Sequence, residues 1–144
     1  MTQEDIANGA HAACLEAAKR FDRDILCVDL DDPARQWWAE TFELHVEGLA
    51  ERIRKQLLGA TLEADGCLTH TPGPRKISWR GHRQRVYQLV AYGTAGRAPS
   101  RQDVVRHLCH NRGCINPNHL RIGSQRENIG DERIRRGLKW AHLG

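Results

Sequence analysis

Hydrophobic residues recur at helical spacing in two long stretches of the N-terminal half of the chain. Over residues 4–20 they form one stripe, which predicts a first helix. A longer stripe predicts an amphipathic helix over 33–58 that Asp32 can cap, with Pro33 in its first turn and Gly59 placed to end it. We expect this second stripe to form a core or a dimer face. Its members are Trp38, Phe42, Leu49, Ile53 and Leu57.

The pattern changes after residue 62, where Gly, Pro and Thr interrupt short apolar runs. The segments GCLTH (66–70) and KISWR (76–80) have the composition of short strands. Residues 83–93 return to helical spacing and predict a helix, and residues 93–100 (GTAGRAPS) predict a loop.

The last 45 residues predict two strands followed by a helix. VVRHL is rich in β-branched residues and predicts a strand ending at His107, and LRI (120–122) predicts a second strand. Ser124 and Glu127 can form a capping box, so a helix is expected to start there and to end near Gly137. The pattern as a whole predicts an α+β fold, with a helical region over 1–62 and a second domain over 63–144.

The charge is divided sharply between the two halves. Residues 1–74 carry seven Lys and Arg against fourteen Asp and Glu, a net charge of −7. Residues 75–144 carry fifteen against four, a net charge of +11, and thirteen of the fifteen are Arg. Arginine presents a planar set of donors that matches phosphate oxygens, so this half is typical of a nucleic-acid-binding protein. The residues that we expect to contact nucleic acid are Arg75, Lys76, Arg83, Arg85, Arg133, Arg135 and Arg136.

The sequence also bears on location. No apolar run approaches the roughly 20 residues that a membrane span requires. The N-terminal MTQEDIANGA lacks the basic and then apolar order of a signal peptide, so we expect a cytoplasmic protein. In that reducing compartment the five cysteines are not expected to form disulfides. Cys14 and Cys27 lie among apolar residues and are expected to be small buried side chains.

The other cysteines lie at metal-ligand spacing. Cys109, Cys114 and His119 are each separated from the next by four residues, and thiolates with imidazole suit tetrahedral zinc. A structural site needs a fourth ligand, for which Cys67 is the first candidate and His70 and His110 are the competitors. Four protein ligands would leave no open position for water, so this zinc is expected to stabilise the fold and not to take part in catalysis.

The run HLCHNRGCINPNHL, with Asn128 nine residues after His119, resembles the His-Me finger (HNH, ββα-metal) nucleases. It is most similar to their zinc-bound branch, which includes the His-Cys box homing endonucleases and phage-type HNH endonucleases. The resemblance covers about residues 65–137 and is strongest over 104–129. It implies that Cys67, Cys109, Cys114 and His119 bind the zinc ion.

The resemblance also implies a reaction and the residues that perform it. His107 would be the general base of a DNA endonuclease, and Asn128 would hold a divalent ion such as Mg²⁺. An arginine on a preceding strand would assist at the scissile phosphate, with Arg80 as the first candidate and Arg75 as the second. The products would carry 5′-phosphate and 3′-hydroxyl ends.

Each of these roles has a plainer alternative. His107 could be a zinc ligand, Asn128 could be an ordinary surface amide, and Asn116 is expected to fix the turn before Pro117. For the chain as a whole, the alternatives are a zinc-stabilised DNA-binding module without activity and a nuclease acting on RNA. We also expect a homodimer, since one site of this kind cuts one strand of a duplex.

Overall fold

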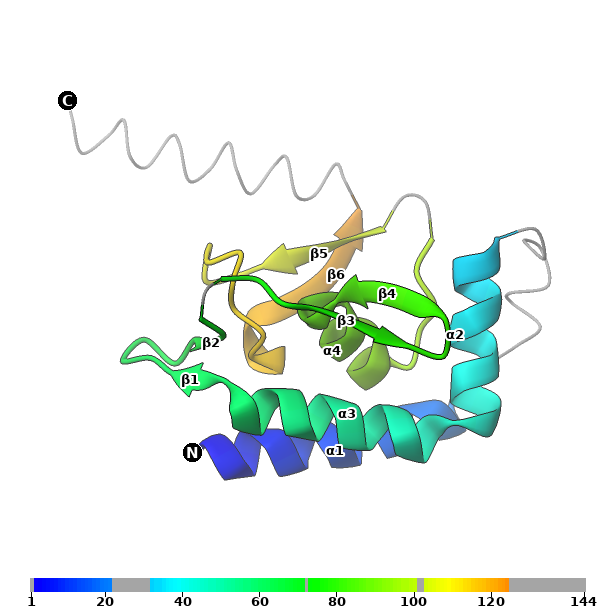
Figure 1. The fold of residues 1–144 in the computed structure, drawn as a ribbon, viewed down its shortest axis with the longest axis horizontal. Coiled ribbons are helices and arrows are strands. Elements are labelled where there is room, and N and C mark those ends of the chain that lie inside the picture. Colours follow the sequence, from blue (N-terminus) through cyan, green and yellow to red (C-terminus); the bar gives the residue numbers. More distant parts are fainter. Residues whose placement is uncertain (1, 22–31, 72, 101–102, 125–144) are drawn as a thin grey trace.

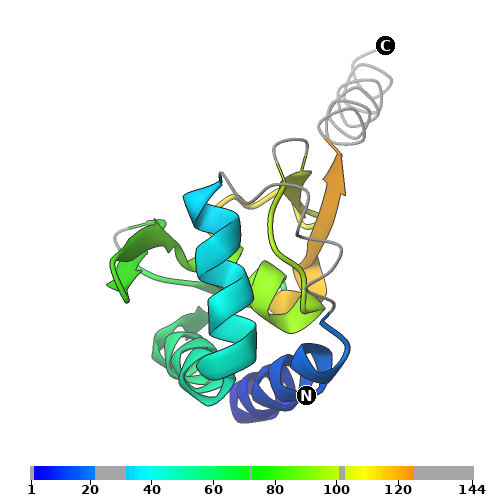
Figure 2. The same cartoon turned by 90° about the vertical axis from the view of Figure 1, so that its right-hand side faces the viewer.

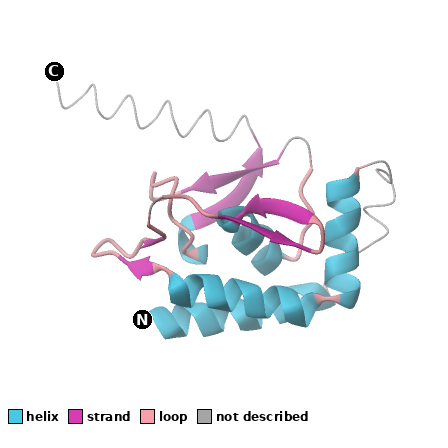
Figure 3. Cartoon of the chain, in the orientation of Figure 1, coloured by secondary structure: helices cyan, strands magenta, loops and turns pink. Residues whose placement is uncertain are grey.

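Four α-helices and three two-stranded antiparallel sheets make up residues 2–21, 32–71, 73–100 and 103–124, which are the residues that the computed structural model describes (Figures 1 and 3). The expected α+β fold is confirmed. The α-helices are α1 (Gln3–Lys19), α2 (Pro33–Leu44), α3 (Val46–Gly59) and α4 (Val86–Ala95). The strands are β1 (Thr61–Leu62), β2 (Leu68–Thr69), β3 (Lys76–Trp79), β4 (His82–Arg85), β5 (Asp103–His107) and β6 (Leu120–Ser124), with the 3-10 helix η2 (Pro117–His119) before β6.

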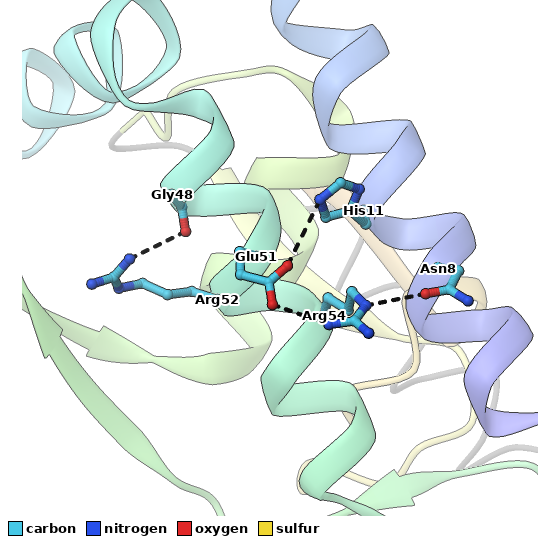
Figure 4. A network of polar contacts seen from close by, with 6 residues as sticks. All are labelled: Asn8, His11, Gly48, Glu51, Arg52 and Arg54. Atoms are coloured by element: carbon cyan, nitrogen blue, oxygen red, sulfur yellow. Dashed lines mark hydrogen bonds and ion pairs between the residues drawn. The ribbon is translucent and has the colours of Figure 1, made fainter.

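The first predicted helix is confirmed as α1, which lies alongside α3 (Figure 1). Its start is fixed by a capping box, in which the Thr2 hydroxyl accepts from the Asp5 backbone N–H and the Asp5 carboxylate accepts from the Thr2 N–H, both at 3.1 Å. Polar side chains line the outer seam between the two helices (Figure 4). Arg54 of α3 donates to the Asn8 side chain on α1 at 3.1 Å and to Glu51 at 3.0 Å.

The single helix predicted over 33–58 is wrong, because the chain breaks at His45. This residue has φ −134° and ψ 24°, outside the helical region, and it ends α2 and begins α3. The two helices therefore run in different directions, with α3 beside α1 and α2 standing across them (Figures 1 and 2). The start at Asp32 and the end at Gly59 are both confirmed, and the Asp32 carboxylate accepts from the Ala34 N–H at 3.0 Å.

The apolar stripe expected on residues 33–58 is core and not a free dimer face. Its five side chains are all buried and join one hydrophobic cluster with Leu89 and Val90 of α4. Ile115 and Leu120 belong to the same cluster, so residues on both sides of position 62 share one core. Cys14 is fully buried, as expected, whereas Cys27 lies outside the described residues.

Helix α4 approaches α1 closely at its C-terminal end. Gly96 caps α4 with φ +67°, and a Cβ atom there would lie 2.7 Å from the Ala17 carbonyl oxygen. Both the left-handed conformation and the close approach require glycine.

The helix predicted over 83–93 begins only at Val86, because the residues before it form strand β4. Strands β3 and β4 are joined by Arg80 and Gly81, whose φ angles of +50° and +76° fit the tight hairpin turn that matches strand twist. Arg83 and Arg85 pair with Ser78 and Lys76 across this hairpin. Figure 2 shows the hairpin projecting to one side of the helices.

The two strands predicted in the last part of the chain are confirmed as β5 and β6. They pair antiparallel from Asp103 opposite Ser124 to His107 opposite Leu120. His107 therefore ends β5, as the sequence predicts. The helix expected after Ser124 lies outside the described residues.

Candidate metal centre

Four side chains from three separate segments converge between β2 and β6. They are Cys67 just before β2, Cys109 and Cys114 in the loop after β5, and His119 at the end of η2, and their ligand atoms all lie within 4.8 Å of one another. Cys67 and Cys114 are fully buried. Among the described residues, this is the one cluster of its kind, and it contains neither His70 nor His110.

The spacing of the donor atoms fits one tetrahedral zinc ion. The Nδ1 atom of His119 lies 3.7 Å from the Cys67 sulfur and 3.5 Å from the Cys114 sulfur. With Zn–S bonds of about 2.3 Å and a Zn–N bond of about 2.0 Å, tetrahedral geometry places sulfur and nitrogen about 3.5 Å apart. Three thiolates and one imidazole are also the soft donors that zinc prefers. The cluster is therefore a Cys3His zinc site with four protein ligands.

Protons must leave the thiols when the metal binds. Burial raises the pKa of Cys67 and of Cys114 above the ordinary range of a thiol. Without metal, both side chains are neutral thiols in a closed interior. Zinc binding is thus coupled to proton release and to the folding of this loop.

The loop that carries the ligands is held by Asn116, whose side chain is buried. Its Oδ1 atom accepts from the Asn118 N–H at 3.0 Å, which confirms the turn expected before Pro117. Its Nδ2 group donates to the Gly66 carbonyl at 2.8 Å and so joins the Cys67 segment to the Cys114 segment. Sequence reasoning missed this second bond, because the spacing along the chain gives no sign that Gly66 lies near Asn116.

The Cys67 segment makes a tight turn beneath the His119 ring. The Cys67 N–H donates to the Asp65 carboxylate at 3.0 Å, and that bond is the main reason that the pKa of Asp65 is lowered. Gly66 has φ +87°, and a Cβ atom there would lie 3.5 Å from Cε1 of His119. The turn therefore positions Cys67, and it also places Gly66 against the ring of His119.

His107 lies at the edge of this loop but is not one of the four clustered residues. Its ring packs edge-on against Tyr87 of α4, with centroids 4.8 Å apart and planes at 71°. The Nε2 atom is buried and has no hydrogen-bond partner among the described residues. Burial is the main cause of a lowered pKa for His107, which the Arg112 charge lowers further and a hydrogen bond with the Cys114 backbone partly offsets. The ring is therefore neutral near physiological pH.

Three exposed basic residues, Lys76, Arg83 and Arg85, lie on one face of the β3–β4 hairpin, which we call the basic ribbon (residues 76–85). Lys76 lies directly opposite Arg85, and Arg83 lies opposite Ser78, and all four are exposed. Arg75, also exposed, precedes the ribbon. Like charges placed opposite each other repel, so this face is poised for an anionic partner. Arg133, Arg135, Arg136 and Asn128 lie outside the described residues.

Arg80 lies at the tip of the ribbon, where the structure gives it other partners. Its guanidinium pairs with Glu40 at 2.9 Å and donates to the Thr41 hydroxyl, both on α2. The ribbon tip lies beside α2, whereas the zinc loop lies towards the other side of the molecule (Figure 1). These contacts favour a structural role for Arg80 over the expected role at the phosphate.

Comparison with known proteins finds a similarity for this loop. Residues 67–135 match the model for the zinc-binding loop region of homing endonuclease, and this span is just under half of the chain. No curated protein and no solved structure matches the chain. None of the helices in the described residues is long and apolar enough to cross a membrane. The matched span contains all four clustered ligands, so the family match and the geometry both indicate a zinc-binding loop in this part of the chain.

Proposed function

We propose that the protein is a metal-dependent endonuclease that hydrolyses phosphodiester bonds in double-stranded DNA. The observation that carries this proposal is the imidazole of His107, which ends β5 beside the zinc loop and keeps an unpartnered Nε2 atom. The match of residues 67–135 to a homing endonuclease region and the basic ribbon both support it.

His107 has the properties of a general base. A neutral imidazole near physiological pH can accept a proton from water, and one ring nitrogen without a protein partner can serve as the acceptor. Because the zinc site is made of four other side chains, the His107 imidazole is available to accept a proton from water. The zinc ion itself would stabilise the loop on which this geometry depends.

Asn128 is the residue that we propose for a second metal ion, through its side-chain oxygen. Such an ion, with Mg²⁺ as the natural choice, stabilises negative charge on the scissile phosphate and on the departing oxygen when it is bound. His107 takes one proton from water, and the oxygen of that water attacks phosphorus. The bond between phosphorus and the 3′ oxygen then breaks, this oxygen takes a proton from solvent water, and His107 releases its proton to the solvent. The products are a 5′-phosphate and a 3′-hydroxyl.

We assign the contact with the DNA backbone to the basic ribbon. A two-stranded ribbon has the width that a major groove accepts, and its exposed face carries Lys76, Arg83 and Arg85. Phosphate contacts of this kind make binding fall steeply with salt. Replacing Arg83 with Gln should weaken binding to all sequences alike and reduce the slope of log affinity against log salt by about 1.

Plasmid cleavage tests the proposal. Purified protein loaded with zinc should convert supercoiled DNA to nicked or linear forms with Mg²⁺ and should not do so with EDTA. His107→Ala should lower the rate by at least about 100-fold, the scale of general-base catalysis, while zinc content stays unchanged.

His110→Asn is the matched control, because this exposed histidine lies in the same loop and Asn tolerates its φ of +61°. It should cut at the rate of the wild type. If the wild-type protein binds DNA but cuts it with no divalent ion, the enzyme proposal fails and the DNA-binding module replaces it. Cleavage of RNA in preference to DNA would contradict the proposed substrate.

A further inference from the structure

We propose that Tyr87 is a positioning residue whose aromatic ring holds the His107 imidazole in its working orientation. This inference rests on the proposed function of His107. Tyr87 is the second residue of α4, and sequence patterning gave it no role other than a place in a predicted helix.

The first observation is the way in which the His107 ring is held. Its buried Nε2 atom has no hydrogen-bond partner among the described residues, and its ring meets the Tyr87 ring at 4.8 Å and 71°. This is the edge-to-face geometry that aromatic rings prefer. Rotation of the imidazole is therefore limited mainly by packing, and Tyr87 supplies an aromatic ring for that packing.

The second observation links the same tyrosine to the DNA-contacting face. The Tyr87 hydroxyl accepts from the Arg85 guanidinium at 3.1 Å, and that guanidinium lies 5.9 Å from the centre of the Tyr87 ring. Arg85 is exposed at the end of the ribbon that leads directly into α4. Arg85, Tyr87 and His107 therefore form a continuous line from the ribbon to the general base.

The local fold keeps this line rigid. The Val86 N–H donates to the Arg75 carbonyl at 3.0 Å, which joins the start of α4 to the chain entering β3. Val86 and Leu89 beside Tyr87 are fully buried, so the helix has little freedom to shift. The Tyr87 ring can therefore hold the His107 side chain in a precise position. Such precision matters because a small displacement of a catalytic group can lower the reaction rate by a large factor.

The test separates the ring from its hydroxyl. Tyr87→Leu removes the aromatic ring and keeps an apolar side chain that suits a helix, whereas Tyr87→Phe keeps the ring. We expect Tyr87→Leu to lower kcat at saturating DNA by 10-fold to 100-fold, with DNA affinity in EDTA and zinc content close to wild type. Tyr87→Phe should restore kcat to within threefold of wild type. Gln88→Ala, on the next residue of the helix, is the control and should have no effect.

A readout that needs no cleavage accompanies these rates. In NMR spectra, the ring protons of His107 should show a ring-current shift in the wild type and in Tyr87→Phe, and should lose it in Tyr87→Leu. If the wild type does not cut, the proposed function fails, and the NMR shifts alone then decide whether Tyr87 orients the imidazole.

Three results would overturn the inference. The first is a kcat for Tyr87→Leu within threefold of wild type. The second is a kcat for Tyr87→Phe as low as that of Tyr87→Leu, which would assign the effect to the hydroxyl. The third is loss of zinc together with activity in Tyr87→Leu, which would show a purely structural role.

Discussion

The zinc loop and the basic ribbon are both short and irregular, yet the protein orders them by different means. In the zinc loop, four donors from distant parts of the sequence converge on one point. The ribbon is instead pressed against α2 and α3 by aromatic rings and arginines. Trp79 packs edge-on against Trp37 at 5.7 Å, and the Arg52 guanidinium lies 4.0 Å above the centre of the Trp79 ring.

This difference explains what the acidic half of the chain does for the basic half. Arg80 reaches from the ribbon to Glu40, and Gly48 leaves room on α3 for Trp79, which would lie 3.0 Å from a Cβ atom there. The acidic helices therefore supply a partner for the arginine at the ribbon tip and leave the other basic side chains exposed. We therefore expect loss of the metal to disrupt the zinc loop, and changes on the surface of α2 to disturb the basic ribbon.

The largest expected effect is that of removing a zinc ligand. Cys114→Ser should lower zinc content from one ion per chain to nearly none and lower the free energy of unfolding by several kcal/mol, because metal binding drives the folding of such loops. The helical circular dichroism signal should persist at low temperature, since α1, α2, α3 and α4 lie outside the loop.

Cys14→Ala provides the contrast, because this thiol is equally buried but belongs to the helical core. It should retain one zinc per chain and cost stability only through packing. Equal zinc content in the two variants would contradict the ligand assignment.

The next effect concerns the bond that closes the zinc loop. Asn116→Asp keeps the acceptor for the Asn118 N–H but sets a carboxylate oxygen against the Gly66 carbonyl. We expect a loss of about 1–3 kcal/mol, as for an unpaired buried polar group, and at least about tenfold weaker zinc binding in a competition titration with a chelator. Asn118→Ala, whose exposed side chain makes no such bridge, should bind zinc normally.

A smaller effect should appear at the junction of the two regions, where His70 of the β2 segment is buried against α3. Burial first and the Arg75 charge second lower the pKa of His70 below its ordinary value, and a hydrogen bond with the Gln56 backbone partly offsets them. The unfolded chain then binds more protons than the folded one below about pH 6.5, the ordinary value for His. Stability is complete above that pH and falls as the solution becomes more acidic.

Urea titrations at pH 7.5 and 5.5 measure this loss. His70→Gln should show a smaller decrease between the two pH values than the wild type does, with both proteins carrying zinc. An identical decrease would mean that other groups, such as His82 with its pKa also lowered by burial, account for the acid sensitivity.

Local chemistry explains which parts of this molecule could be predicted from the sequence. The zinc ligands could be predicted, because three of the four lie within eleven residues and because thiolates together with imidazole suit tetrahedral zinc. The end of β5 at His107 could be as well, since β-branched residues mark the strand. The break at His45 could not, because no Gly or Pro marks it and the apolar stripe continues on both sides.

The partners of Arg80 could not be predicted from the sequence either. Nothing in the sequence near Arg80 indicates that Glu40 will lie 2.9 Å from its guanidinium, since that contact depends on how α2 is placed across the core. The Tyr87 and His107 rings likewise meet only when α4 packs against β5. Residues whose role depends on long-range packing are therefore the ones that sequence reasoning places wrongly or overlooks.

The smallest expected effect is on DNA affinity, and it tests whether Arg80 holds the ribbon against α2 or contacts DNA. Its side chain is 18 % exposed and Glu40 is 55 % exposed, so the pair contributes at most about 1 kcal/mol to stability. Glu40→Gln removes a negative charge, which by simple electrostatics should strengthen DNA binding. If α2 holds the ribbon in position through this pair, Glu40→Gln should instead weaken binding by about twofold to fivefold, and Arg80→Ala should weaken it by a similar factor. Glu47→Gln, at an exposed position in the first turn of α3, gives the electrostatic response for comparison. Fluorescence anisotropy with a labelled duplex in EDTA measures the DNA affinity of all three variants. Tighter binding by Glu40→Gln would contradict the structural role of Arg80 and favour its contact with phosphate.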